Sequence, residues 1–86
     1  MLATLVIPES IIEDVAAEVQ RARTKFPRNV NLNIALSEEF GEFAAAQLQG
    51  RKGDTYKEGI QVIGLVVRIL TEGDASIVMD DESMQK

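Results

Sequence analysis

The hydrophobic positions of the chain recur with a helical period in three long segments. In the first segment they lie three or four positions apart, as on one face of a helix. Pro8 suits a first helical turn, and Ser10 with Glu13 fits a capping box. The pattern predicts a helix over residues 8–25, and its apolar face is formed by Ile11, Ile12, Val15, Val19, Ala22 and Phe26.

Two turn-rich stretches, KFPRNVN at 25–31 and GRKGD at 50–54, separate this helix from two further helical patterns. The second pattern spans residues 31–49, and Gly50 is placed to end it. The third spans residues 54–72, with Asp54 as the expected N-cap and Gly73 after its end. Its β-branched centre would also suit a strand, but strands seldom exceed about ten residues, so the distance between the two glycines favours a helix.

The predicted fold class is therefore all-α, with three main helices in one domain over residues 1–86. Such a short chain buries only about 60% of its unfolded surface, and it has no cysteine or histidine for a disulfide or a zinc site. We expect a homodimer or homotetramer in which helices of different subunits pack as a four-helix bundle. Residues 73–86 have a weaker pattern and are expected to form a tail that is mobile or docks on a partner subunit.

The charge balance narrows the range of partners. Fourteen acidic side chains against nine basic ones give a net charge of −5, so binding to nucleic acid is not expected. The opening MLATLVI lacks a basic leader, and IQVIGLVVRIL at 60–70 is short and contains an arginine. We expect no membrane span and a cytoplasmic location.

Acidic side chains lie on the apolar faces of the second and third helices. A helix turns about 100° per residue, which places Glu39 at the centre of the apolar stripe, Glu42 at its edge and Glu38 further round. The same construction places Glu58 at the centre of the third helix's stripe and Gln61 at its edge. Two helices that pack through these stripes would bring four oxygen-bearing side chains together.

No lysine or arginine occurs between residues 34 and 46 to balance these acids. A buried carboxylate without a partner costs several kcal/mol, so it takes up a proton or binds a cation. Mg²⁺ suits an all-oxygen site, whereas zinc prefers nitrogen and sulfur ligands. Two alternatives stay open: the acids form a hydrated surface, or Glu58 pairs with Lys57, Arg68 or a basic residue of the first helix.

The motif SEEFGE at 37–42, followed after fifteen residues by EGIQ at 58–61, resembles the MazG-like all-α nucleotide pyrophosphohydrolase superfamily. This group includes dimeric dUTPases and small phage and bacterial proteins, and its pattern is E-E-x-x-E followed by E-x-x-D. Glu38, Glu39 and Glu42 match the first half and Glu58 begins the second. Gln61 stands where the pattern has Asp. The resemblance covers roughly residues 19–70.

The resemblance implies a house-cleaning enzyme that hydrolyses a nucleoside triphosphate to the monophosphate and pyrophosphate with Mg²⁺. Glu39, Glu42 and Glu58 would hold the metal, with Gln61 offering a carbonyl oxygen in the Asp position. Glu38 and Glu39 would be the catalytic residues, and Glu38 would orient the attacking water or bind a further ion.

Several basic residues are candidates for binding the substrate's phosphates, although each also suits an ion pair or a solubilising role. The base of the nucleotide would need an aromatic surface. Phe43 lies on the core stripe and Phe40 points away from it, while Phe26 and Tyr56 are the other aromatic residues. The candidate phosphate-binding residues are Lys57, Arg68, Arg51 and Lys52, with Lys25 as a further basic residue.

Gln61 also motivates a different hypothesis, because it removes one negative charge from the predicted metal site. The chain would then be a non-catalytic relative that binds a nucleotide or a metal. A third hypothesis is a helical protein-interaction module without a ligand.

Overall fold

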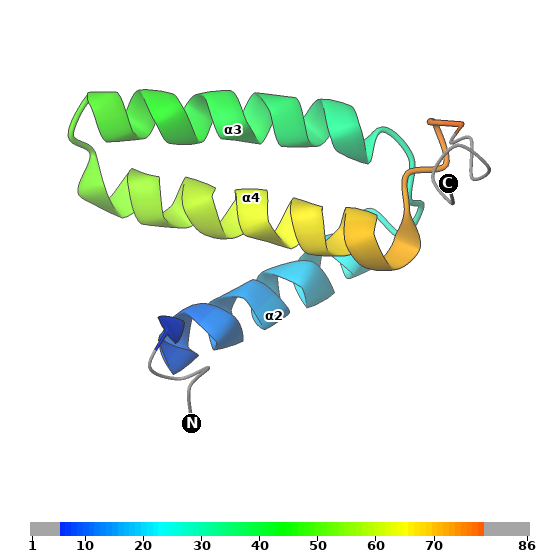
Figure 1. Cartoon of the computed structure of the whole chain (residues 1–86), viewed down its shortest axis with the longest axis horizontal. Coiled ribbons are helices and arrows are strands. Elements are labelled where there is room, and N and C mark those ends of the chain that lie inside the picture. The colour runs from blue at the N-terminus through cyan, green and yellow to red at the C-terminus, as the bar shows by residue number, and fades with distance from the viewer. Residues whose placement is uncertain (1–5, 79–86) are drawn as a thin grey trace.

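The computed structural model of the chain describes residues 6–78, and in this range it consists of three helices without a strand. The helices are α2 (Glu9–Lys25), α3 (Leu32–Leu48) and α4 (Lys52–Glu72), as Figure 1 shows. The prediction of an all-α fold with three main helices is confirmed. Each predicted boundary lies within two residues of the observed one.

Helix α4 is the central element. It runs antiparallel to α3 and is joined to it by a short turn, while α2 crosses on the other side (Figure 1). Only four apolar residues are buried among residues 6–78, so the core is small. They come from all three helices: Val19, Leu32, Ala46 and Ile60.

Two predictions about helix starts are wrong. Helix α2 begins at Glu9 directly after Pro8, so Ser10 lies inside the first turn and no side chain forms a cap hydrogen bond there. Helix α4 begins at Lys52, which places Asp54 in its first turn rather than at the N-cap. There Asp54 accepts a hydrogen bond from Arg51 Nη1 at 2.6 Å, and its negative charge lies near the positive end of the helix dipole.

The predicted helix ends at glycine are confirmed. Gly50 follows α3 and Gly73 follows α4, with φ angles of 70° and 76°. This left-handed region is accessible to glycine without the Cβ conflict that other residues meet, so both positions let the chain leave its helix and turn back.

The carboxylate that accepts the free N–H groups at the start of α3 belongs to Asp74, a residue distant in the sequence. Asn31 occupies the N-cap position with a left-handed φ of 59°, and its side chain makes no cap hydrogen bond. Instead the backbone N–H groups of Asn31 and Asn33 donate to the carboxylate of Asp74 at 3.1 and 2.8 Å. The N–H of Ser76 donates to the same carboxylate at 2.9 Å. The Ser76 hydroxyl also donates to this carboxylate, and its hydrogen bond, followed by that of the Asn33 N–H, lowers the pKa of Asp74 to about 2.

Neighbouring contacts tie the end of α4 to the loop between α2 and α3. The side-chain amide of Asn29 donates to the Glu72 carbonyl at 2.9 Å, and Ala75 N–H donates to the Asn29 carbonyl at 2.7 Å. The Glu72 carboxylate accepts from Arg68 Nη2 at 3.0 Å and also pairs with Arg23. Residues 73–76, predicted to belong to a tail, thus bind their own chain, while residues 79–86 of that tail lie outside the described residues.

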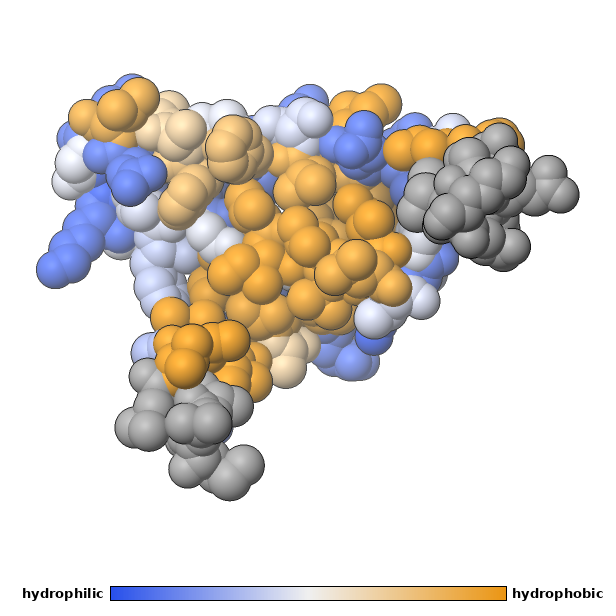
Figure 2. Space-filling model, viewed as in Figure 1, coloured by the Kyte–Doolittle hydropathy of each residue, from blue (hydrophilic) through white to orange (hydrophobic). Residues whose placement is uncertain are grey.

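Much apolar surface remains uncovered. Figure 2 shows an apolar patch that extends over α4 towards α2. None of the three helices in the described range is both long and apolar enough to cross a membrane. The exposed apolar side chains of α2 and α4 include Ile12, Ile63, Val66 and Leu70.

Replacing Asp74 tests the contact that caps α3. We expect Asp74→Asn to lower the melting temperature by about 5 °C near neutral pH, the scale for losing one helix cap in a small domain. Because folding lowers the pKa of Asp74 from 3.8 to about 2, its stabilisation is complete above the unfolded value and is lost as the pH falls towards the folded one. Circular-dichroism melts across this range measure the difference.

The matched control is Asp54→Asn, which removes an exposed ion pair with Arg51 and one charge near the start of α4. Both contributions are weak at an exposed site, so the melting temperature should fall less than for Asp74→Asn. Equal melting temperatures for wild type and Asp74→Asn at neutral pH would show that the cap contributes nothing.

Candidate metal site and adjoining cavity

The packing of α3 against α4 brings three carboxylates together. Glu39 and Glu42 come from α3 and Glu58 from α4, and one oxygen of each lies within 4.8 Å of the others. Glu39 and Glu58 are half-buried, whereas Glu42 is exposed. The convergence of acids from the two apolar stripes, expected from helical periodicity, is therefore present. We call these three residues the acidic triad.

A glycine beside the triad lets the two helices approach. A Cβ atom at Gly59 would lie 3.1 Å from Cε1 of the Phe43 ring. The ring packs against the α4 backbone one residue from Glu58, as its position on the core stripe predicted. Gly59 thus sets the separation of α3 and α4 where the carboxylates meet.

No basic side chain neutralises the triad. None of the ion pairs within residues 6–78 includes Glu39, Glu42 or Glu58, so the alternative in which Glu58 pairs with Lys57, Arg68 or a base of α2 is wrong. The four pairs found in this range are Arg21–Glu18, Arg23–Glu72, Arg51–Asp54 and Arg68–Glu72.

Gln61 lies beside the triad with its side-chain oxygen towards Glu39 and Glu58. This is the orientation in which the oxygen could join the acids in holding a metal, and that role stays a prediction. Without a cation, the amide turned over would instead donate from its nitrogen to Glu39 Oε2 and, at 3.1 Å, to Glu58 Oε1, because two acceptors call for a donor between them.

The close approach of the carboxylates changes the pKa values of Glu39 and Glu42. Burial raises the pKa of Glu39, the charge of Glu42 raises it further, and a hydrogen bond with Glu58 acts in the opposite direction. For Glu42, the hydrogen bond with Glu58 and then the charge of Glu58 raise the pKa, while Lys57 lowers it. The ionised form of Glu39 is thus disfavoured in the folded protein.

The donor set fits a hard divalent cation. All three triad residues offer carboxylate oxygens, the ligands that Mg²⁺ prefers. Glu58 Oε2 is buried and has no hydrogen-bond partner in the described part of the chain. Buried polar atoms are normally satisfied, so this oxygen has an unused acceptor position at the point where the three side chains meet.

The other predicted catalytic residue lies outside the triad. Glu38 is exposed on α3, and its charge adds to the effects that raise the pKa of the neighbouring Glu39. Its role in orienting a water stays a prediction.

The predicted phosphate-binding residues are dispersed. Arg51 and Lys52 are exposed at the turn between α3 and α4, where Arg51 bonds to Asp54. Lys57 is exposed on α4, close enough to Glu42 for its charge to act on that carboxyl. Arg68 is only 1% exposed and is paired with Glu72, so its charge already has a partner.

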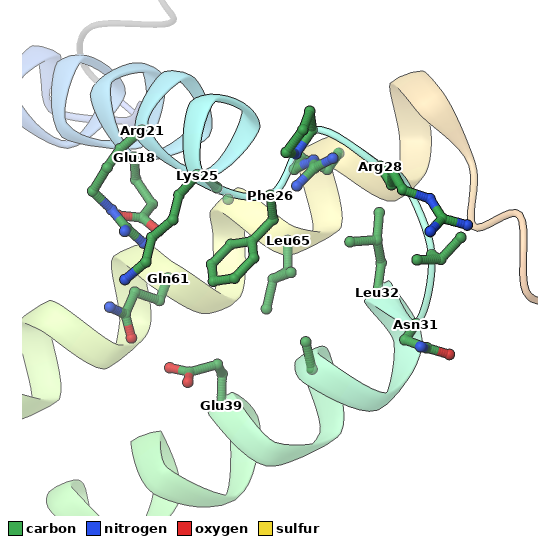
Figure 3. A pocket seen from close by; sticks show the side chains of 16 residues that line it. Glu18, Arg21, Lys25, Phe26, Arg28, Asn31, Leu32, Glu39, Gln61 and Leu65 are labelled. Atoms are coloured by element: carbon green, nitrogen blue, oxygen red, sulfur yellow. The ribbon is translucent and has the colours of Figure 1, made fainter.

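A cavity of about 490 Å³ opens beside the triad and is lined by all three helices and the α2–α3 loop. Figure 3 shows its arrangement, with Glu39 and Gln61 on one side and Phe26, Leu32 and Leu65 around the remainder. One side is therefore polar and continuous with the triad, while the other is apolar. We call it the central cavity.

The side of the central cavity formed by α2 carries Lys25, a predicted candidate for phosphate binding, together with Glu18 and Arg21, which the sequence did not indicate. Glu18, Arg21 and Lys25 line it, and the same three residues line an adjoining, more open cavity of about 720 Å³ that reaches Tyr56 and Lys57. The i,i+3 spacing of Glu18 and Arg21 was the available signal, but it is common on solvated helices and did not indicate a site.

Comparison of the chain with models of protein families, with curated proteins and with solved structures finds no match in any of the three. The resemblance to the MazG-like group thus rests on the motif residues alone and stays a prediction.

Replacing Glu39 by a neutral residue tests whether its negative charge destabilises the folded protein. A carboxyl whose pKa is raised by folding stabilises the protein below its unfolded value of 4.5, and this contribution is lost as the pH rises through the folded value. We therefore expect Glu39→Gln, measured in EDTA near neutral pH, to raise the melting temperature by a few degrees.

The control is Glu13→Gln, which changes an exposed glutamate of α2. A lower melting temperature for Glu39→Gln than for this control would show that the charge of Glu39 does not destabilise the folded protein.

Proposed function

We propose that the chain is a Mg²⁺-dependent nucleoside triphosphate pyrophosphohydrolase of the house-cleaning type, acting in the cytoplasm. It would convert a nucleoside triphosphate and water to the monophosphate and pyrophosphate. One observation carries the proposal: three carboxylates from two helices meet beside a cavity of about 490 Å³, and none of them has an ion-pair partner within residues 6–78. This combination suits a metal-bound phosphate chain attached to an organic group.

The two sides of the central cavity match the two parts of a nucleotide. Its volume lies within the range of about 300–1,000 Å³ typical of small-molecule sites. Phe26, Leu32 and Leu65 provide an apolar surface suited to a base, and Phe26 offers an aromatic ring. Glu39 and Gln61 adjoin the triad, where the phosphates would lie.

Glu39, Glu42 and Glu58 would hold the metal, and the unsatisfied oxygen of Glu58 favours this assignment. Bound Mg²⁺ neutralises phosphate charge and lowers the pKa of a coordinated water. Gln61 would keep Glu39 and Glu58 aligned through its amide. Glu38, next to Glu39 and exposed, would orient the water.

Self-association to a dimer or tetramer is part of the proposal. Apolar side chains are exposed on α4 and also on α3. A second copy that covered these faces would supply the core that one chain lacks. The large apolar side chains exposed on α3 are Ile34, Phe40 and Leu48.

A non-catalytic nucleotide-binding relative is the second candidate, and the Gln61 amide favours it. With its nitrogen turned towards Glu39 and Glu58, this group would donate to both acids and hold them together without a cation. The Asp of the family pattern would instead add a further negative ligand.

Magnesium-dependent melting combined with a pyrophosphate assay tests the function. We expect millimolar Mg²⁺ to raise the melting temperature of wild type, since a ligand that binds only the folded state stabilises it. Glu58→Gln should abolish this rise. It should also reduce pyrophosphate release from nucleoside triphosphates on the order of 100-fold, the scale for losing one electrostatic stabiliser of a transition state.

Glu13→Gln serves as the control and should behave as wild type. A melting temperature that Mg²⁺ leaves unchanged would favour a helical interaction module. Nucleotide binding without pyrophosphate release from any common or modified triphosphate would favour the non-catalytic relative.

Gln61→Asp separates the two ligand-binding hypotheses. The change removes the amide donor and adds a negative charge, so we expect a lower melting temperature in EDTA and a larger rise with Mg²⁺ than for wild type. Paired melts measure both effects. If pyrophosphate release appears only in this variant, the natural chain is the binder. An unchanged response to Mg²⁺ would contradict the place of Gln61 beside the metal.

A further inference from the structure

An arginine of α2 faces the acidic triad across the central cavity. Figure 3 shows Arg21 and Lys25 extending from α2 towards Gln61, with Glu39 on the opposite side. Both basic residues also line the adjoining cavity, so they lie where the two cavities meet.

The position of Arg21 is fixed by a neighbouring carboxylate. Its Nε and Nη2 atoms donate to the two oxygens of Glu18 at 3.0 and 2.7 Å. Such a two-point contact fixes the plane of a guanidinium as well as its distance. The remaining nitrogen, Nη1, makes no hydrogen bond within residues 6–78, and 51% of the side chain is exposed. Arg21 therefore retains donor capacity for a second anion.

Glu18 is itself held in place by α4. A Cβ atom at Gly64 would lie only 3.0 Å from Glu18 Cγ, so the acid packs against the bare backbone of the helix. Its side chain is 16% exposed, far less than that of Arg21. The arginine is thus anchored to the same helix that carries Glu58 and Gln61.

Except for Lys57, which lies on α4 itself and whose charge acts on Glu42, the other basic residues near the site have partners or lie elsewhere. Arg68 is paired with Glu72, and Arg51 with Asp54. Lys25 Nζ lies 5.5 Å from the centre of the Phe26 ring, within the range of a cation–π contact. Arg28 lies at the other end of the central cavity from Glu39 and Gln61 (Figure 3).

We propose that Arg21, oriented by Glu18, binds the phosphate chain of the ligand from the side opposite the acidic triad. The identity of that ligand as a nucleotide rests on the proposed function. A guanidinium suits this task because its planar array of donors matches phosphate oxygens. The phosphate chain would then be held between the metal-binding carboxylates of α3 and α4 and a cation from α2.

Two matched alanine variants test the proposal. Arg21→Ala and Arg23→Ala each remove an exposed arginine of α2 that pairs with a glutamate, but of these two only Arg21 lines the central and adjoining cavities. The probe is inorganic pyrophosphate with Mg²⁺, titrated by calorimetry. We expect Arg21→Ala to weaken binding about tenfold or more, as for loss of a charged hydrogen bond, and Arg23→Ala to leave it unchanged.

Two milder variants keep the test valid if Arg21→Ala folds poorly. Arg21→Lys retains the charge without the planar fork, and Glu18→Gln weakens the anchor without removing Arg21. Both should bind Mg²⁺–pyrophosphate with affinities between those of wild type and Arg21→Ala. Equal affinity for wild type and all three cavity variants would overturn the proposal, as would no pyrophosphate binding by wild type.

Kinetics separate this proposal from the proposed function. If wild type hydrolyses a nucleoside triphosphate, Arg21→Ala should raise KM more than it lowers kcat, and unchanged kinetic constants would overturn the role of Arg21 while leaving the enzyme assignment intact. If wild type hydrolyses none but loses pyrophosphate affinity only in the cavity variants, the enzyme assignment fails and the anion site stands.

Discussion

The structure depends on the meeting of three carboxylates between α3 and α4, which have no ion-pair partner among residues 6–78. Like charges within 4.8 Å oppose the packing that brings them together, so donors, protons or a cation must offset them. Three neighbouring features bear on this repulsion. Gly59 permits the close approach, the Gln61 amide can donate to Glu39 and Glu58 when its nitrogen is turned towards them, and an oxygen of Glu58 keeps an unused acceptor position in the described part of the chain. Two helices that packed through apolar side chains alone would need none of these contacts.

The helices and the meeting of the acids could be predicted because both follow from local periodicity. A period of 3.6 residues places Glu39 and Glu58 on apolar stripes, and burial of the stripes forces the side chains together. The glycine ends were predictable for an equally local reason. Capping was not: the carboxylate at the start of α3 belongs to Asp74, 41 positions beyond the Asn33 N–H that it accepts. Helix-start rules consider only neighbouring residues, and at Ser10 they placed a cap inside a helix.

The α2 side of the cavity could not be predicted because it depends on where two helices cross. Glu18 and Arg21 form an ordinary i,i+3 pair in the sequence, and only the packing of Glu18 on Gly64 directs them towards the triad. The assignment of Arg68 to phosphate has a different, local reason. Helical geometry placed Arg68 on the flank of Gln61, but Glu72 lies four positions further along the same helix and pairs with it. That i,i+4 spacing was available in the sequence, whereas the burial of Arg68 depends on packing. The spacing of the motif therefore predicts the triad of α3 and α4, but not the α2 residues that lie on the other side of the cavity.

Paramagnetic broadening by Mn²⁺ tests the central claim most directly, since this ion prefers the same oxygen ligands as Mg²⁺. Substoichiometric Mn²⁺ would be titrated into isotopically labelled protein and followed by heteronuclear NMR. The account predicts that signals of residues 38–42 and 58–61 broaden first and that excess Mg²⁺ restores them. Broadening spread evenly over exposed acids such as Glu13 and Asp54, or none at all, would contradict a shared cation site between α3 and α4.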